Sequence, residues 1–462
     1  MAVDAGRESV MDSAGHRHAM AELVRRLPAM VFLGTLHVDV CKRIASSMGY
    51  QGLHYRVFVN LLVKHSRPAR QITALISLVR HGDIELRTVD SCFATRSVLR
   101  GFIDMDGVQC SHEHLHCGDF LRQGALLKLL VKTLLHRGYR LFFSPGKAAS
   151  ASIRSWVEIT EKMYGDRYRD ARVLIYPFYL NLPRHLKYLR RCFRQYPRVT
   201  LCGLPYNPLH WVRLAVAPRN FDAAYLRFEI EAYRRHGSEL AQQPGHRLYT
   251  SDEFEAGALA MVEAIRERGG EVVNTAHGLS FGCPYVAYND FAVYNTAQET
   301  YYAKHSPDTR FVVSPRINAG EADRLNVARD GARTIIYIEA NYRSLGMTFE
   351  ADLQDRIIAA IARLAESGSL AAVIKAHPNR SQADYADYRR RTGLDIVRHL
   401  NELGTIAPLF VTIASAAYYD FRQYGPFVFI DDGYSDLNDF YGENLQGCSI
   451  DELPGAIDAA FS

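Results

Sequence analysis

The sequence contains no uninterrupted run of about 18 or more apolar residues, the length at which a segment becomes a candidate transmembrane helix. Residues 1–18 are polar and include Asp4, Glu8 and Asp12, unlike the basic and then apolar layout of a signal peptide. We therefore expect a cytoplasmic protein, which could still lie peripherally on the inner membrane.

Cysteine pairs of the Cys-x-x-Cys type are also missing. The 8 cysteines are scattered, at positions 41, 92, 110, 117, 192, 202, 283 and 448. This spacing argues against a zinc ribbon, a redox pair or a secreted disulfide framework, and favours reduced, mostly buried thiols. The segment His112-Glu-His-Leu-His-Cys117 suggests a metal site at first glance, but its alternating histidines match no known zinc spacing. We expect no bound metal.

The chain has no strong charge of one sign, since 55 Lys and Arg stand against 50 Asp and Glu, a formal net charge of +5. Basic residues are nevertheless locally dense, most clearly in segments 120–136 and 184–198, where apolar residues recur at helical spacing. Such segments are usually solvated helix faces over a core, but a basic amphipathic helix can also lie on an anionic membrane. The density favours an anionic partner such as a nucleotide, a phospholipid or an acidic glycan. We expect no nucleic-acid partner.

Hydrophobic residues, in contrast, are abundant. A chain of 462 residues with 48% hydrophobic content exceeds the usual size of a single core, so we expect two domains. Strand-like runs alternate with amphipathic helical stretches, a pattern typical of an α/β protein with parallel, Rossmann-like sheets. We predict strands at 30–33, 55–59, 139–143, 173–176, 246–250, 271–274, 334–339, 372–375, 409–413 and 427–430, and a helix over 350–366.

Polar segments and turn-forming residues indicate the domain boundaries. Residues 1–25 are predicted to be a mobile N-terminal arm. Residues 26–315 are predicted to form a first Rossmann-like domain, and residues 316–462 a second one. The segment 311–334 contains Pro315, Gly320 and Gly331 among polar residues, and we interpret it as the crossing between the domains.

The most informative motif is Val373-Ile-Lys-Ala-His-Pro378, an apolar strand that ends in a Lys-x-His-Pro turn. The ring of Pro378 holds His377 extended and stops the strand. Lys375 and His377 together suit a diphosphate, either as charge partners or as a proton donor to the leaving phosphate oxygen. A plain surface turn is the alternative.

A second histidine, His277 in Asn274-Thr-Ala-His-Gly278, also follows a strand. The carboxyl ends of parallel strands carry the ligand sites of open sheets, so two such histidines from two sheets can face one cleft. We predict a catalytic role for His277, with a hydrogen-bonded loop residue as the alternative. Nearby, Asp252 or Glu253 could act as a general base, although Ser251 or Asp252 could instead only cap a helix.

A small-residue turn, Ile413-Ala-Ser-Ala-Ala-Tyr418, lies between a predicted strand and a helix. Small residues let a phosphate approach the backbone donors of a helix N-terminus, so we predict that Ser415 and Ala416 bind the donor phosphate. Ser415 as a simple N-cap is equally compatible. We assign Asn341 and Arg343, in the polar loop after strand 334–339, to the same donor site.

Together these motifs resemble a known group of transferases. The segments Ala276-His277-Gly278, Lys375-Ala-His377-Pro378, the Ser415 turn, Asp431-Asp-Gly433 with Asp436, and Tyr441-Gly442 are similar to those of GT-B-fold bacterial transferases that build surface polysaccharides. That group includes capsule and lipopolysaccharide sialyl- and Kdo-transferases with a His-Pro motif, and teichoic-acid glycerophosphotransferases. The resemblance covers residues 245–460. Ser415 is flanked by alanines where the phosphotransferases have an Asp-Tyr-Ser-Ser-like turn.

The resemblance implies two facing Rossmann-like domains, with the nucleotide-activated donor on the C-terminal domain and the acceptor on the N-terminal domain. It also implies that His377 serves the donor phosphate, Ser415 binds phosphate, and either His277 or an acidic residue is the base. We accordingly expect an inverting, metal-independent glycosyltransferase of capsule or O-antigen synthesis, using a CMP-linked donor and a glycan or lipid-linked acceptor. The alternatives are a CDP-glycerol-type glycerophosphotransferase and a non-catalytic nucleotide- or glycan-binding protein of an export complex.

Overall fold

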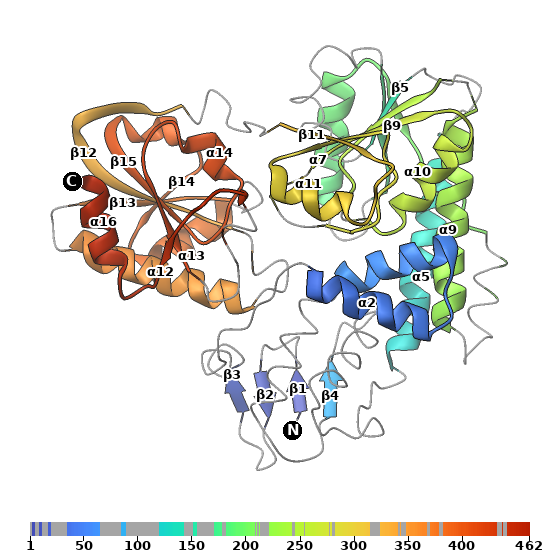
Figure 1. Cartoon of the computed structure of the whole chain (residues 1–462), viewed down its shortest axis with the longest axis horizontal. Helices are drawn as coiled ribbons and strands as arrows, with labels where there is room; N and C mark the ends of the chain where they lie inside the picture. Colours follow the sequence, from blue (N-terminus) through green and yellow to red (C-terminus); the bar gives the residue numbers. More distant parts are fainter. Residues whose placement is uncertain are drawn as a thin grey trace.

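The computed structural model of the chain forms two parallel sheets covered by helices, and one small mixed sheet (Figure 1). The residues that it describes are 2–4, 9–11, 17–19, 35–64, 85–88, 120–142, 151–154, 171–177, 182–207, 209, 212, 221–242, 245–253, 255–276, 278–279, 282–314, 324–340, 342, 348–366, 370–377, 382–431, 437 and 441–462. None of the helices within these segments is both long and apolar enough to cross a bilayer.

The N-terminal sheet has seven parallel strands in the order β7-β6-β5-β8-β9-β10-β11. They are β5 (Ala151–Arg154), β6 (Arg172–Ile175), β7 (Val199–Leu201), β8 (Arg247–Thr250), β9 (Glu271–Thr275), β10 (Asp290–Val293) and β11 (Arg310–Val313). Their centres are apolar and buried, as at Val173, Leu248, Val272 and Phe291. Strands buried on both faces are continuous apolar runs, which explains why several of them can be recognised in the sequence.

The C-terminal sheet has six parallel strands in the order β14-β13-β12-β15-β16-β17. They are β12 (Asn326–Ile338), β13 (Ala371–Lys375), β14 (Asp395–Val397), β15 (Thr405–Thr412), β16 (Phe427–Ile430) and β17 (Gly447–Cys448). Phe410 in β15 is fully buried and stacks on Phe421 and Phe427. Apolar side chains on both faces of β12 and β15 form the core of this domain.

Numbered along the chain, both sheets have the strand order 3-2-1-4-5-6, and the N-terminal sheet adds a seventh strand at its edge. This is the order of a Rossmann fold. The direction of winding reverses between β5 and β8 in one sheet and between β12 and β15 in the other. Ligands of such sheets bind outside the carboxyl ends of the strands at this switch point. The predicted α/β class with two parallel Rossmann-like sheets is therefore confirmed.

Helices cover both sheets (Figure 1). In the N-terminal half they are α2 (Thr35–Ser47), a helix over residues 52–64, α5 (Phe120–Arg140), α7 (Leu182–Gln195), α9 (Phe221–Leu240), α10 (Ala258–Arg266) and α11 (Thr296–Ala303). In the C-terminal half they are α12 (Thr348–Glu366), α13 (Gln382–Thr392), the 3-10 helix η7 (Leu400–Leu403), α14 (Ala417–Phe421) and α16 (Leu453–Phe461). The predicted helix over 350–366 is thus confirmed within α12.

Two predicted strands are wrong. Residues 55–59 lie inside the helix over 52–64, and residues 139–142 form the end of α5 and the turn after it. Both segments are short apolar runs, and periodicity alone does not separate a short buried strand from a buried stretch of helix. Packing decides here, because Val57, Phe58 and Leu62 all enter the large N-terminal core from the helix. The predicted strand at 30–33 lies outside the described residues.

The described residues of the predicted N-terminal arm form three short strands, and the mobility of this arm stays a prediction. They are β1 (Ala2–Asp4), β2 (Ser9–Met11) and β3 (Arg17–Ala19), and they form a four-stranded sheet with β4 (Glu85–Thr88). At the other predicted boundary, β11 closes the N-terminal sheet at Val313 and β12 opens the C-terminal sheet at Asn326. The division of the chain at residue 315 stays a prediction.

Candidate functional site

The carboxyl ends of β12, β13 and β15 bring three polar groups to the switch point of the C-terminal sheet. Glu339 follows β12, His377 follows β13 and Ser415 follows β15. These strands are neighbours in the order β13-β12-β15, so residues that are 38 or more positions apart in the chain meet at one edge. The structure thus places His377 and Ser415, both predicted site residues, at the same end of adjacent strands.

Glu339 is the buried support of the His-Pro turn. Its side chain is only 3% exposed, and its Oε2 accepts a hydrogen bond of 2.9 Å from the backbone N–H of His377. Its own backbone N–H donates to the carbonyl of Lys375 at 3.1 Å. A buried carboxylate requires such polar contacts, so the turn before Pro378 is held in one conformation. Sequence reasoning missed this role, although an acid that ends the apolar strand 334–339 was its signal.

Lys375 points away from the switch point. Its Nζ donates to the carbonyl oxygen of Arg398 at 2.7 Å, beyond the end of β14. Because β14 lies on the far side of β13 from β12, this ammonium group is drawn toward the outer edge of the sheet. The structure therefore does not bring Lys375 and His377 together as a pair of phosphate ligands, which was the expected arrangement.

Ser415 is fixed by Tyr441. The hydroxyl of Tyr441 accepts from the Ser415 N–H at 2.8 Å and lies 3.1 Å from the Ser415 carbonyl, to which it donates. Ser415 Oγ accepts from the N–H of Ala417 at 3.2 Å, the local bond expected of a serine at a helix start. Burial raises the pKa of Tyr441, so its hydroxyl keeps its proton. Ala416 stands at the N-cap of α14, which is only five residues long and so has a weak helix dipole.

Several predicted residues lie outside the described part of the chain. They are His277, Asn341, Arg343, Pro378, Asp432, Gly433, Asp436 and the segment 112–117. Their assignments stay predictions. Within the described residues, no group of three or more His, Cys, Asp or Glu side chains is arranged to hold a metal ion.

At the N-terminal switch point, the segment after β8 carries Ser251, Asp252 and Glu253. The predicted capping role is wrong, because α10 begins only at Ala258 with Gly257 at its N-cap. Ser251 Oγ instead donates to the carbonyl of Thr275 at 2.9 Å. The chain thus runs on for several residues after the strand before it turns into a helix, and its polar side chains bind the neighbouring strand.

Asp252 and Glu253 are buried against β9. The N–H of Asp252 donates to Asn274 Oδ1 at 3.0 Å, while Asn274 Nδ2 lies 3.4 Å from Glu253 Oε2. Both acids line a small cavity whose walls come from the helix over 52–64, α10 and the segment 283–288. Glu253 is 1% exposed, which favours a structural role over proton transfer to an external acceptor.

Cys283 closes the same cavity. Its backbone N–H donates to the Glu253 carbonyl at 2.8 Å, and its Sγ lies 3.7 Å from the carbonyl oxygen of Asn60. Burial raises the pKa of the Cys283 thiol to about 12. The thiol therefore stays protonated at neutral pH and is unsuited to act as a nucleophile.

Ala276 and Gly278, the two neighbours of His277 in the chain, each form a hydrogen bond through their backbone. The N–H of Ala276 donates to the carbonyl of Ala292 at 2.8 Å, continuing the pairing of β9 with β10. The carbonyl of Gly278 accepts from Gln298 Nε2 at 2.9 Å, and Gln298 Oε1 accepts from the N–H of Tyr294 at 2.8 Å. Gln298 in α11 therefore ties the turn after β9 to the end of β10. This clamp was not foreseen from the sequence.

The carboxyl edges of the two sheets face each other through α11 and α14 (Figure 1). Asn295 caps α11 with its Oδ1 at 2.9 Å from the Gln298 N–H, and its Nδ2 donates to the hydroxyl of Tyr419 in α14 at 3.1 Å. The rings of Tyr294 and Tyr419 lie 5.7 Å apart. Tyr419 belongs to the same apolar cluster as the N-terminal core, so the two domains are packed together at this point.

A glycine completes this junction. Gly442 has a φ of +64°, which only glycine adopts at little cost, and a Cβ there would lie 3.0 Å from Thr296 Oγ1 at the start of α11. The segment that carries Tyr441 therefore lies against the first turn of α11. Tyr441-Gly442 thus joins the Ser415 turn on one side to the N-terminal domain on the other.

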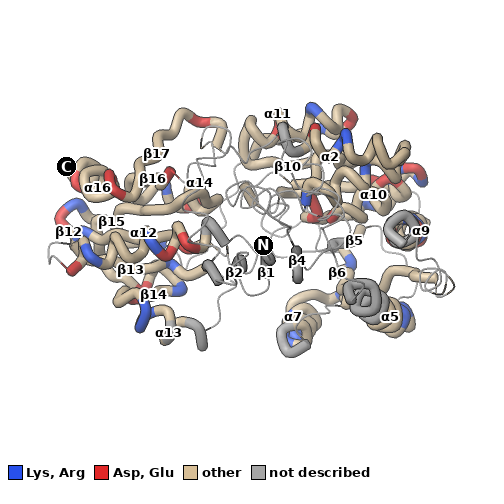
Figure 2. Tube along the Cα trace, turned by 90° about the horizontal axis from the view of Figure 1, so that it is seen from below, with Lys and Arg blue, Asp and Glu red and all other residues tan. Residues whose placement is uncertain are grey.

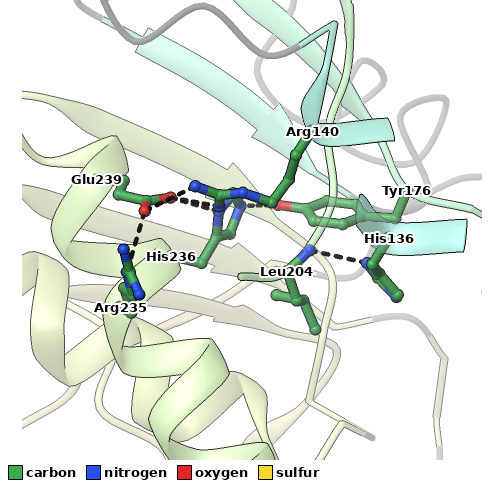
Figure 3. A network of polar contacts seen from close by, with 7 residues as sticks. All are labelled: His136, Arg140, Tyr176, Leu204, Arg235, His236 and Glu239. Atoms are coloured by element: carbon green, nitrogen blue, oxygen red, sulfur yellow. Dashed lines mark hydrogen bonds and ion pairs between the residues drawn. The ribbon is translucent and has the colours of Figure 1, made fainter. Parts of the chain in front are cut away.

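A second polar network joins α5, α9 and the segment after β6 in the N-terminal domain (Figure 3). Arg140 at the end of α5 donates to both carboxylate oxygens of Glu239 in α9, at 2.8 and 3.0 Å, and Arg235 lies 3.5 Å from the same carboxylate. His236 Nδ1 is 3.8 Å from Glu239, and His236 Nε2 is 2.8 Å from the hydroxyl of Tyr176, just after β6. Burial alone would raise the pKa of Glu239, but these hydrogen bonds hold it at about 2. The network fixes α5 and α9 to the sheet.

No family model matches the chain, and a search of curated proteins finds no significant match.

Proposed function

We propose that the protein is a GT-B-type, inverting and metal-independent glycosyltransferase, which moves a sugar from a CMP-linked donor to a glycan or lipid-linked acceptor. The observation that carries this proposal is the pairing of two sheets of Rossmann strand order whose carboxyl edges face each other across α11 and α14. Each sheet offers a switch-point site, and such sites bind nucleotides or their acceptors. The resemblance of residues 245–460 to capsule and lipopolysaccharide transferases supports the same assignment.

The C-terminal switch point suits the donor. His377 is positioned by the buried Glu339, and the Ser415–Ala416 turn is positioned by Tyr441, so both groups are arranged before a ligand arrives. Preorganised donors stabilise the charge that develops on a departing phosphate better than mobile ones. Asn341 and Arg343, in the loop after β12, are proposed as further donor ligands on the basis of their sequence position. Lys375 is the weakest member of this set, because it contacts Arg398.

The N-terminal switch point suits the acceptor. We assign His277 as the general base, with Asp252 as the alternative and Glu253 as the least suited because of its burial. In the reaction, the base takes the proton of an acceptor hydroxyl, and the hydroxyl oxygen attacks the anomeric carbon opposite the nucleotide. The bond from that carbon to the phosphate oxygen breaks, and the nucleotide leaves with the electron pair. His377 and the Ser415 turn stabilise the charge on this phosphate.

A thermal-shift panel of CMP, CDP, UDP and GDP tests the donor class. A ligand at about 100 times its dissociation constant adds roughly 2.7 kcal/mol to the free energy of unfolding, so a true ligand is readily detected. We expect a cytidine nucleotide to stabilise the protein most, and we expect Glu339→Leu, which removes the acceptor of the His377 N–H, to reduce that shift by loosening the His377 turn. A larger shift with UDP or GDP contradicts the CMP-linked donor, and no shift with any of the four contradicts the nucleotide site itself.

A second experiment determines the chemical class of the transferred group. Incubation with CMP-sugars and with CDP-glycerol, followed by mass spectrometry of the product, separates a glycosyltransferase from a glycerophosphotransferase, because only the latter adds phosphorus. The second class remains the alternative, since the histidine matched by His277 is the candidate base in that group. Nucleotide binding without turnover of any donor would instead assign a non-catalytic binding protein of an export complex.

A further inference from the structure

Residues 131–140, the C-terminal half of helix α5, have their polar side toward the domain. Lys132, Thr133, His136 and Arg140 recur there at helical spacing and face the domain. Val131, Leu134 and Leu135 lie on the opposite side of this half and are exposed. A surface helix of a globular protein normally has the reverse arrangement, with the apolar stripe on the core. The exposed side chains of Val131, Leu134 and Leu135 would therefore be more stable in contact with an apolar environment outside the protein.

The polar contacts of α5 leave no doubt about which face points inward. Lys132 Nζ lies 2.6 Å from Glu229 Oε1, and its ammonium group sits 5.1 Å from the ring centre of Tyr206. His136 Nδ1 accepts from the backbone N–H of Leu204 at 2.8 Å, and Arg140 forms the two bonds to Glu239 (Figure 3). Buried charged and polar groups need these partners, so the helix cannot rotate about its axis to bury its apolar side.

The apolar surface continues past α5 and onto α7. Leu141 and Phe142, in the turn after α5, are 86% and 65% exposed. The hydroxyl of Tyr139 lies 2.6 Å from His185 Nε2, which joins the end of α5 to the start of α7, and Figure 2 places the two helices beside each other. Leu186 and Phe193 in α7, seven residues apart and so on one helix face, are each 55% exposed.

The same surface is basic. Neither α5 nor α7 contains an aspartate or a glutamate. Lys132 and Arg140 face the domain and pair with Glu229 and Glu239, whereas the exposed cations of the described part of the two helices are Arg137, Lys187, Arg190, Arg191 and Arg194. Within the described residues, Lys187, Arg190 and Arg194 are exposed and form no ion pair with a carboxylate. Exposed Leu and Phe side chains bordered by cations match an anionic lipid surface, whose headgroups attract the charges while the acyl boundary accepts the apolar groups.

We propose that the surface formed by α5, residues 141–142 and α7 docks the protein onto an anionic phospholipid bilayer. Leu134, Phe142 and Phe193 enter the boundary between headgroups and acyl chains, while Lys187 and Arg194 bind the headgroup layer. This docking proposal does not depend on the proposed transfer reaction. If the proposed function also holds, docking through the N-terminal domain would bring the acceptor domain close to a lipid-linked acceptor.

Cosedimentation of the full chain with vesicles tests the proposal. Vesicles of phosphatidylcholine containing phosphatidylglycerol should bind the protein at low salt, and vesicles of phosphatidylcholine alone should bind it far less. Salt near 1 M, where the Debye length is about 3 Å, should release most of the protein. Equal binding to both kinds of vesicle, or binding to neither, would overturn the proposal. Binding to an acidic protein or a polyanion without any binding to vesicles would overturn it as well.

Paired variants separate the two contributions. Lys187→Gln with Arg194→Gln should weaken vesicle binding by about tenfold or more, since each cation at an anionic surface contributes about fivefold. The matched control, Arg356→Gln with Arg363→Gln, removes two exposed arginines at the same spacing from α12 and should change nothing. Phe142→Ser with Phe193→Ser should abolish the binding that survives high salt, whereas Met48→Ser, another exposed apolar residue, should not.

Two further readouts keep the outcomes distinct. All variants should melt like the wild type, because the replaced side chains are exposed and make few contacts. They should also give the wild-type thermal shift with CMP. Loss of vesicle binding with an unchanged nucleotide shift supports the surface, whereas a control pair that weakens binding as much as the α7 pair refutes it. Failure of every nucleotide to bind would count against the proposed function alone.

Discussion

The two Rossmann-like sheets share one strand order but differ at their carboxyl edges. At the C-terminal edge, single groups hold the backbone turns: Glu339 binds the His377 N–H, and Tyr441 binds Ser415. At the N-terminal edge, the acids Asp252 and Glu253 turn inward to a cavity closed by a helix from the first 64 residues. The same topology thus places supported backbone turns at the carboxyl edge of one sheet and buries its acids at that of the other. Topology sets where a site lies, and the side chains behind it decide what it can bind.

The largest expected effect concerns the cores of the two sheets. Phe410→Ala in the C-terminal sheet and Phe291→Ala in the N-terminal sheet each remove a fully buried ring that contacts several other rings. Each should lower the free energy of unfolding by about 3 to 5 kcal/mol. Urea titrations followed by fluorescence and circular dichroism measure this loss. Because Tyr419 lies in the N-terminal cluster, both losses should appear in one cooperative transition, and two separate transitions would contradict coupling of the domains.

The next effect separates the two histidines. His377→Ala should weaken nucleotide binding and slow turnover, whereas His277→Ala should leave nucleotide binding nearly intact and lower kcat by about 100-fold or more. Titration of CMP and initial rates with the identified donor are the measurements. Wild-type turnover in His277→Ala would transfer the role of base to Asp252. Asp252→Asn then needs a melting curve beside it, since Asp252 is buried and its loss also affects folding.

Acid should weaken the N-terminal domain through His305. Burial, with the nearby Lys42 and Lys304, lowers the pKa of His305 to about 4, while Asp39 opposes this shift. Folding thus favours the neutral ring, which accepts from Lys42 Nζ at 3.1 Å. The stabilisation is complete above the unfolded pKa of about 6.5 and is lost as the pH falls toward 4, so about 1 to 2 kcal/mol should disappear between pH 7 and pH 5. His305→Gln should flatten this pH dependence in urea titrations.

Glu239 also lies in the N-terminal domain, but its lowered pKa affects stability in a different pH range from that of His305. Its folded pKa of about 2 lies below the ordinary value of 4.5, so its contribution is present above pH 4.5 and is lost only as the pH falls toward 2. If His305→Gln loses as much stability between pH 7 and pH 5 as the wild type does, the loss belongs to a group other than His305.

The smallest effect concerns the contact between the domains. Asn295→Ala removes both the cap of α11 and the bond to Tyr419, and should cost about 1 kcal/mol or somewhat more. Tyr419→Phe removes only the hydroxyl at the junction and should cost less. Thermal melting of both variants, alone and with CMP, measures the difference. Because Tyr419→Phe also removes the bond from the Tyr419 hydroxyl to the Tyr441 carbonyl, an equal loss in the two variants would mean that the cap contributes no more than that bond.

Local sequence patterns located much of the fold and part of the site. The predicted strands at 246–250, 271–274, 372–375 and 427–430 coincide with β8, β9, β13 and β16 to within one or two residues. These strands are buried on both faces, so they leave continuous apolar runs bounded by polar or turn-forming residues. The placement of His377 and Ser415 at strand ends follows directly, because a residue after a strand lies at its carboxyl edge.

Near neighbours in the chain predict the alternation of strands and helices, the two parallel sheets and the polar residues at the strand ends. The contacts of Glu339 with His377, of Tyr441 with Ser415 and of Asn295 with Tyr419 join residues 38, 26 and 124 positions apart, so they depend on how the whole chain packs. Packing also makes residues 55–59 helical and leaves Val131, Leu134 and Leu135 of α5 exposed. No local periodicity encodes such choices, since they depend on which distant surfaces and partners are available when the chain packs.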